Sequence, residues 1–219
     1  MRMRIDSEIK RDVENELKWD PDIDATDIGV AVKNGVVTLS GFVRGYTQKY
    51  QAEKAAKRVK GVLGVANDIE VRLSSSNERT DPELAREAVE AINLELPFSY
   101  EKIKVVVKDG WLTLEGHAEW EYQRNRAEAA VRRLRGVKGI SNLITLKPRV
   151  PATEVKAKIE DALKRMAEVD ADRITVSANG SEVVLSGTVR SWAERQEAER
   201  AAWRAPGVTE VDNRITIAS

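Results

Sequence analysis

The densest positive feature of this sequence is a group of basic residues on, and just beyond, a predicted helix in the middle third of the chain. The group comprises Arg124, Arg126, Arg132, Arg133, Arg135 and Lys138. Cations near a helix C-terminus are favoured by the helix dipole, so a solvated helix face is one interpretation. The other is a contact with an anionic lipid surface or a protein partner, in which each basic side chain near an anionic membrane contributes about 1 kcal/mol. Aromatic residues are not interleaved with these charges, which argues against nucleic acid as a partner. The candidate contact residues are Arg124, Arg132, Arg133 and Arg135.

Trp111 belongs to a second candidate contact site. Alternation along the predicted strands places it on the sheet face that the helices leave open, together with Val106, Leu143 and His117. The third repeat, defined below, has polar residues on the same face: Thr175, Ser177, Glu182, Ser186 and Thr216. Because an exposed apolar patch usually marks an interaction site, we interpret Trp111, Val106 and Leu143 in two ways. They form a contact between repeats or between chains, which would give a homo-oligomer, or they insert into a membrane, where Trp favours the interface.

Catalytic and metal chemistry find little support in the composition. The chain has one histidine, His117, and no cysteine, so a zinc cluster and a Cys–His pair are both excluded. No phosphate-binding glycine loop follows a predicted strand. We therefore expect no catalytic residue, no metal and no cofactor, and His117 is interpreted as a surface or packing residue. The 36 basic and 36 acidic residues balance, which argues against the broad positive field of a nucleic-acid binder.

An internal repeat predicts the secondary-structure elements that position these residues. The run Asn34–Gly41 (Asn-Gly-Val-Val-Thr-Leu-Ser-Gly) returns as Asp109–Gly116 and again as Asn179–Gly187, the last with one extra residue. Asn-Gly and Asp-Gly tolerate the positive φ angles of a type I′ turn, so each run predicts a β-hairpin. The second Gly of each run is expected to close the outgoing strand. Gly61 and Asn67 also recur in all three copies, which indicates tandem domains.

Hydrophobic periodicity completes each copy. A helix with apolar residues at i, i+4 spacing comes first, as in Ile5, Ile9, Val13 and Leu17. After the hairpin comes an alanine-rich helix, for which Trp120 and Trp192 stand at the start of the second and third examples, and then a short strand. We predict an α+β protein of three small α-β-β-α-β domains in tandem, each with a three-stranded mixed sheet and two helices on one face.

The domain boundaries are predicted from the repeat and from composition. The first domain covers residues 1–73, the second 80–147 and the third 152–219. A polar, flexible linker is expected at 74–79 and a proline-stiffened one at 148–151. The second and third domains are therefore expected to hold a more fixed relation than the first and second.

The start of the sequence contains no apolar core of a signal peptide, and no run approaches the roughly 18 apolar residues of a membrane-spanning helix. The sequence as printed is expected in the cytoplasm, whereas a chain whose leader had been removed would look the same and would be periplasmic. The absence of cysteine fits either compartment.

Three features occur together in each copy: the α-β-β-α-β order, a hairpin like that of Asn34–Gly41, and a helix followed by Gly-Val-x-x-Val-x-Asn, with Ile140 for the second Val in the middle copy. In this combination the chain resembles the BON domain family over roughly residues 5–73, 80–147 and 152–218. The resemblance implies a non-enzymatic, transport-associated bacterial module that binds phospholipid membranes and is linked to osmotic stress. The expected function is a binding or adaptor protein at anionic phospholipid surfaces or envelope components in stress protection. The alternative is a protein–protein assembly module without lipid binding.

Overall fold

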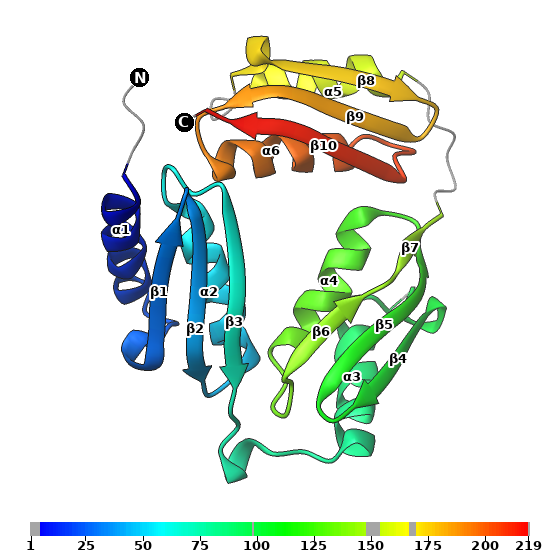
Figure 1. Cartoon of the computed structure of the whole chain (residues 1–219). Helices are drawn as coiled ribbons and strands as arrows, with labels where there is room; N and C mark the ends of the chain where they lie inside the picture. The colour runs from blue at the N-terminus through cyan, green and yellow to red at the C-terminus, as the bar shows by residue number, and fades with distance from the viewer. Residues whose placement is uncertain (1–4, 98, 148–153, 167–169, 219) are drawn as a thin grey trace.

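The computed structural model describes residues 5–97, 99–147, 154–166 and 170–218, which form three domains at the corners of a triangle (Figure 1). The first domain consists of α1 (Asp6–Trp19), β1 (Ile28–Lys33), β2 (Val36–Val43), α2 (Tyr46–Arg58) and β3 (Gly64–Val71). The second consists of α3 (Asp81–Glu95), β4 (Ile103–Lys108), β5 (Trp111–Ala118), α4 (Glu121–Arg132), β6 (Gly139–Asn142) and β7 (Thr145–Leu146). The third consists of α5 (Val155–Arg165), β8 (Ile174–Asn179), β9 (Glu182–Val189), α6 (Trp192–Trp203) and β10 (Glu210–Ile217). Short 3-10 turns lie at Ala25–Asp27, Ser75–Asn77, Tyr100–Lys102 and Ala171–Arg173.

Each sheet is mixed, as predicted. In the first domain β2 is the central strand, antiparallel to β1 and parallel to β3. The third domain repeats this order as β8, β9 and β10. In the second domain the last strand is interrupted at Leu143 and Ile144, so that β6 and β7 pair separately with β5. The α+β architecture of three tandem domains is thereby confirmed.

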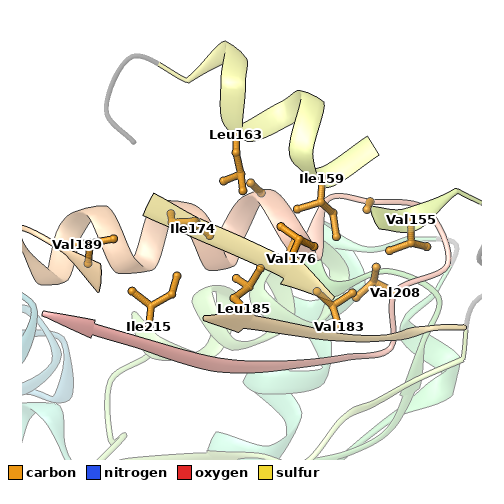
Figure 2. Close-up of a cluster of buried hydrophobic side chains, with 14 residues drawn as sticks. Val155, Ile159, Leu163, Ile174, Val176, Val183, Leu185, Val189, Val208 and Ile215 are labelled. Carbon is orange, nitrogen blue, oxygen red and sulfur yellow. The ribbon is translucent and has the colours of Figure 1, made fainter. Parts of the chain in front are cut away.

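Each domain buries its own apolar core between the sheet and the two helices. Figure 2 shows the core of the third domain, where Ile159 and Leu163 point from α5 toward Val176 and Leu185 on the sheet. Alanines at the buried face of the second helices, such as Ala198 and Ala202, let these helices lie close to the strands. Ile5, which was expected on the stripe of α1, is instead the exposed N-cap residue of that helix.

The three hairpins are alike in length, and this corrects the expectation of an extra residue in the third. Asn34 and Gly35 both have positive φ, as a type I′ turn requires, and so do Asp109 and Gly110. In the third hairpin Asn179 already belongs to β8 and pairs with Glu182, so the turn is Gly180–Ser181 and not Asn179–Gly180. Only its first residue has positive φ, which is the pattern of a type II′ turn.

The second glycine of each hairpin run has a different role from the one predicted. Gly41 does not close β2, which continues to Val43; it is the last residue of β2 that pairs with β1. Its φ is +107°, and a Cβ there would lie 1.9 Å from the carbonyl oxygen of Asp27. The same close approach recurs at Gly116 and Gly187. Glycine is required because the turn before β1 crosses directly over this point.

The recurring asparagine ties the last strand of each domain to its second helix. Asn142 donates to the backbone oxygen of Arg124 and to Glu128 Oε2, at 3.1 Å each, and accepts from the N–H of Ile144. Asn67 and Asn213 make the equivalent contacts in the other two domains. This residue therefore serves the fold.

Candidate functional site

The basic helix α4 lies where the three domains meet. The second helices of the domains, α2, α4 and α6, contact one another through an aromatic ring and a cation at every boundary. The arrangement is head to tail: the N-terminal half of each helix contacts the C-terminal end of the next. We call this arrangement the helix ring, defined by α2, α4 and α6.

Arg132 occupies the boundary between the first and second domains. Its guanidinium carbon lies 3.5 Å from the centre of the Tyr50 ring, and its Nη2 donates to Glu128 Oε1. The hydroxyl of Thr47 donates to the Arg132 carbonyl at 3.1 Å. Tyr46 packs against the core of the second domain, and burial, followed by the charge of Glu128, raises the pKa of its phenol. The Arg132 side chain is only 17% exposed, so most of it faces protein.

The other two boundaries are built on the same plan. The guanidinium carbon of Arg124 lies 5.0 Å from the centre of the Trp203 ring, which joins the second domain to the third. The ammonium of Lys57 lies 5.3 Å from the Trp192 ring, which joins the first domain to the third. Trp192 was expected only at the start of α6, and the structure adds its contact with the first domain. The C-terminal ends of the three helices carry equivalent residues: Lys57, Arg132 and Trp203. At two boundaries this end supplies the cation, and at the third it supplies the aromatic ring.

The predicted contact residues of the basic group thus separate into two sets. Arg124 and Arg132 contact other domains of the same chain, whereas Arg133 and Arg135 are exposed. Arg126 is also exposed and lies over the ring of Tyr122 in its own helix. The proposal of an external anionic partner therefore concerns Arg133 and Arg135, and it stays a prediction.

Trp111 lies at the hairpin end of the second domain and is 49% exposed. Its indole Nε1 donates to Ser141 Oγ at 2.9 Å. The ring lies against Gly139, the residue that pairs with Trp111 in the neighbouring strand. A Cβ at Gly139 would come within 2.3 Å of the ring, so the glycine makes room for the indole. The hydrogen bond and the close packing fix the orientation of an exposed aromatic side chain.

A hollow of about 460 Å³ opens beside this ring. It is lined by Val106, Lys108, Asp109, Trp111, Thr113 and Lys138. Val106 and Trp111 are thus brought together, as the alternation along the strands predicted. Leu143 is 59% exposed but does not line the hollow, and His117 is half-buried and pairs with Thr145.

Two lysines flank Trp111, and one of them was missed from the sequence. Lys108 is its cross-strand partner in the hairpin. Lys138, a member of the basic group, donates its backbone N–H to the carbonyl of Gly110. The signal for Lys108 was present in the hairpin turn, because the two residues that flank a two-residue turn always pair. We call Trp111, Lys108 and Lys138 the tryptophan patch.

The other domains differ at the equivalent positions. The first domain carries Val36 and Leu63, both partly exposed, and the third carries Glu182. Trp19, which is 84% exposed at the end of α1, is followed in sequence by Asp20, Asp22 and Asp24. Trp111 has two lysines beside its ring, whereas Trp19 stands between Lys18 and Asp20 in the sequence.

Within the described residues, no group of three His, Asp or Glu side chains is placed to hold a metal ion. In the same part of the chain, no helix has the length and apolar character needed to cross a bilayer.

Comparison with known proteins gives a family match over each repeat. The sequence model of the BON domain matches residues 5–72, 80–148 and 151–219. The chain is 32% identical over 141 residues to osmotically-inducible protein Y of Escherichia coli (strain K12). That alignment covers 63% of this chain and 70% of the relative.

Two solved structures are similar at low identity. CdsD, a structural protein of the type III secretion system of Chlamydia trachomatis, is 14% identical with a TM-score of 0.27, covering 96% of this chain and 92% of that chain. The PrgH periplasmic domain is 11% identical with a TM-score of 0.22, covering 94% and 99%.

Proposed function

Because this chain belongs to the BON domain family, we propose that it is a non-enzymatic binding protein that attaches to anionic phospholipid surfaces in protection against osmotic stress. The match of the family model to all three repeats and the similarity to an osmotically inducible protein support the stress context. The tryptophan patch supports the lipid surface.

The observation that carries the proposal is the pairing of an exposed indole with two lysines. Tryptophan favours the boundary between hydrocarbon and headgroups, because its ring is apolar and its N–H is polar. Lys108 and Lys138 would contact the anionic headgroups around it, together with Arg135, which lies in the same loop as Lys138. The first domain has an apolar residue here and the third an acidic one, so the second domain is the proposed contact.

Vesicle co-sedimentation tests the proposal. The wild type should pellet with vesicles that contain phosphatidylglycerol, and binding should weaken as salt screens the lysines. Trp111→Ser and the double variant Lys108→Glu/Lys138→Glu should each reduce pelleting several-fold. Equal, negligible pelleting with phosphatidylglycerol and with neutral phosphatidylcholine vesicles would overturn the proposal.

Trp19→Ser is the matched control. It removes an even more exposed tryptophan, which has one lysine before it and is followed in sequence by Asp20, Asp22 and Asp24, groups that an anionic surface repels. Its pelleting should equal that of the wild type. Loss of binding in Trp19→Ser and not in Trp111→Ser would move the contact away from the second domain.

A second candidate function is protein assembly through the same patch. It is favoured by the fixed orientation of Trp111, whose N–H is already bonded to Ser141. In that case the patch would contact a second copy of the chain, and Trp111→Ser would lower the mass measured by light scattering after size exclusion. An unchanged mass would exclude this function.

A further inference from the structure

The two helices of the first domain are joined by an arginine that has two acidic partners. Arg58, the last residue of α2, bonds through Nε to Glu16 Oε1 at 2.8 Å and through Nη2 to Asp20 Oδ2 at 3.2 Å. Burial lowers the pKa of this guanidinium, and the bonds to the two carboxylates outweigh that effect and raise it. These ion pairs link the C-terminal ends of α1 and α2.

The third domain keeps the arginine and lacks both acids. Arg204 holds the position of Arg58, and Ala162 and Met166 hold those of Glu16 and Asp20. The correspondence is fixed by the buried stripe, because Ala162 lies next to Leu163 as Glu16 lies next to Leu17. Within the described residues the Arg204 guanidinium makes no ion pair.

A groove of about 450 Å³ lies at this position between α5 and α6. It is lined by Lys158, Ala162, Arg165, Met166, Ala201, Arg204, Ala205 and Pro206. Among the described residues, the lining combines apolar side chains with three cationic ones and includes no carboxylate. Arg165 and Arg204 are exposed, so the cations border an open groove.

We propose that this groove is a binding site for a small anionic amphiphile: a carboxylate on a single hydrocarbon chain, such as a medium-chain fatty acid. The ligand's carboxylate would take the place that Glu16 and Asp20 occupy in the first domain and would bond to Arg204. Its chain would lie against Ala162, Met166 and Ala205, and the volume falls in the range of roughly 300–1,000 Å³ that small-molecule sites have.

Charge complementarity selects this class of ligand. An arginine fork binds a carboxylate by two charge-assisted hydrogen bonds, and the exposed Arg165 adds favourable potential. A cationic amphiphile of the same length would meet like charges. A free anion without a chain would leave the apolar lining in contact with water and bind more weakly.

The site is separate from the proposed membrane contact. It lies in the third domain and takes single molecules from solution, whereas the tryptophan patch lies in the second domain and would contact a bilayer. Loss of one function therefore leaves the other measurable on the same protein.

The experiment is a titration of the full chain with decanoate, decyltrimethylammonium and inorganic phosphate, below their aggregation concentrations. The S-methyl resonance of Met166, one of three methionines in the chain, reports occupancy of the groove itself. Decanoate should shift this resonance saturably, while the cationic amphiphile should not. Phosphate should bind at least tenfold more weakly than decanoate. Absence of a saturable decanoate shift, or equal affinity for phosphate, would overturn the proposal.

Two sets of variants follow from the comparison of the domains. Arg204→Gln should weaken decanoate binding at least tenfold, since it removes the charge-assisted bonds to the carboxylate at an exposed position. Ala162→Glu/Met166→Asp restores the acids of the first domain and should abolish binding measured by calorimetry. The reverse change, Glu16→Ala/Asp20→Met, frees Arg58 and should create a second site. Arg58→Gln is the control and should leave decanoate binding unchanged. Undiminished binding by Arg204→Gln would refute the assignment.

Discussion

The guanidinium of Arg132 stacks on the ring of Tyr50, with its carbon 3.5 Å from the ring centre, and thereby joins the second domain to the first. The sequence of neither repeat alone predicts this contact. The pair is one of three equivalent contacts in the helix ring. It is also the closest of them, and Arg132 is further held by Glu128.

We expect a double-mutant cycle of Arg132→Ala and Tyr50→Ala to give a coupling free energy of about 1–2 kcal/mol in urea unfolding of the full chain. A cation–π pair reaches this range where it is largely shielded from water, as Arg132 is. The control cycle is Arg126→Ala and Tyr122→Ala, an exposed pair within α4. Its coupling should stay below about 0.5 kcal/mol. Equal couplings in the two cycles would argue against a specific interface.

Gly139→Ala should displace the Trp111 ring. The added Cβ would lie within 2.3 Å of the indole, so the ring must turn and its bond to Ser141 must break. We expect a loss of about 1–3 kcal/mol of stability and a shift of the Trp111 indole N–H resonance. Gly64→Ala is the control, because the same Cβ in the first domain lies 3.9 Å from Val36. If the two variants are equally stable, the packing of Trp111 on Gly139 is not tight.

Glu194→Gln should reduce the acid sensitivity of the third domain. Burial raises the pKa of Glu194, but the N–H groups of Arg190 and Asp170, with the Arg190 guanidinium, outweigh burial and hold the pKa below its ordinary value of 4.5. Stability from this carboxylate is therefore present above about pH 4.5 and is lost as the pH falls through the lower, folded-state pKa.

The measurement is the urea midpoint of the third domain between pH 3 and pH 7. The wild type should lose stability over the acid part of this range more steeply than Glu194→Gln. Gln123 holds the equivalent position in the second domain and accepts from the N–H groups of Glu119 and Trp120. Gln123→Glu should therefore introduce a similar acid dependence there, and identical profiles for all three proteins would contradict the assignment.

Asp81→Ala should destabilise the second domain by about 1–3 kcal/mol. Its carboxylate accepts from the N–H groups of Asp109 and Gly110, at 2.8 and 3.0 Å, and so binds the hairpin turn to the start of α3. Asp81→Asn keeps one acceptor oxygen and should lose about half as much. Urea unfolding would show the order wild type, Asn, Ala, and a reversed order of the two variants would exclude the proposed contact.

Local elements of the fold were predictable because their causes are local. Stripes such as Ile9, Val13 and Leu17 and the hairpins at Asn34 and Asp109 appear in the structure as expected. The third turn was misassigned because Asn179-Gly180 repeats the dipeptide of the first. Only the pairing of Asn179 with Glu182 shows that the turn is one residue further along.

The candidate site was predictable only in part, for a different reason. Exposure of Trp111 followed from alternation along one strand. The contacts of Arg124 and Arg132 did not, because their ring partners lie in other domains and follow no hydrophobic period. The equivalent positions at the C-terminal ends of α2, α4 and α6 carry lysine, arginine and tryptophan. Because these residue types differ, comparing the repeats does not reveal that all three contact a neighbouring domain.

The helix ring has a consequence for the number of repeats. Each second helix has one contact surface at its N-terminal half and a different, complementary one at its C-terminal end. Contacts between two such different surfaces are called heterologous when they join subunits. Three copies joined by such contacts form a closed ring. The three domains of this single polypeptide are therefore arranged like the three subunits of a cyclic trimer. Deleting one repeat opens the circle and leaves two complementary ends exposed on the same molecule. We expect shortened chains to join end to end through these two surfaces, which in the intact chain are occupied by its own neighbouring domains.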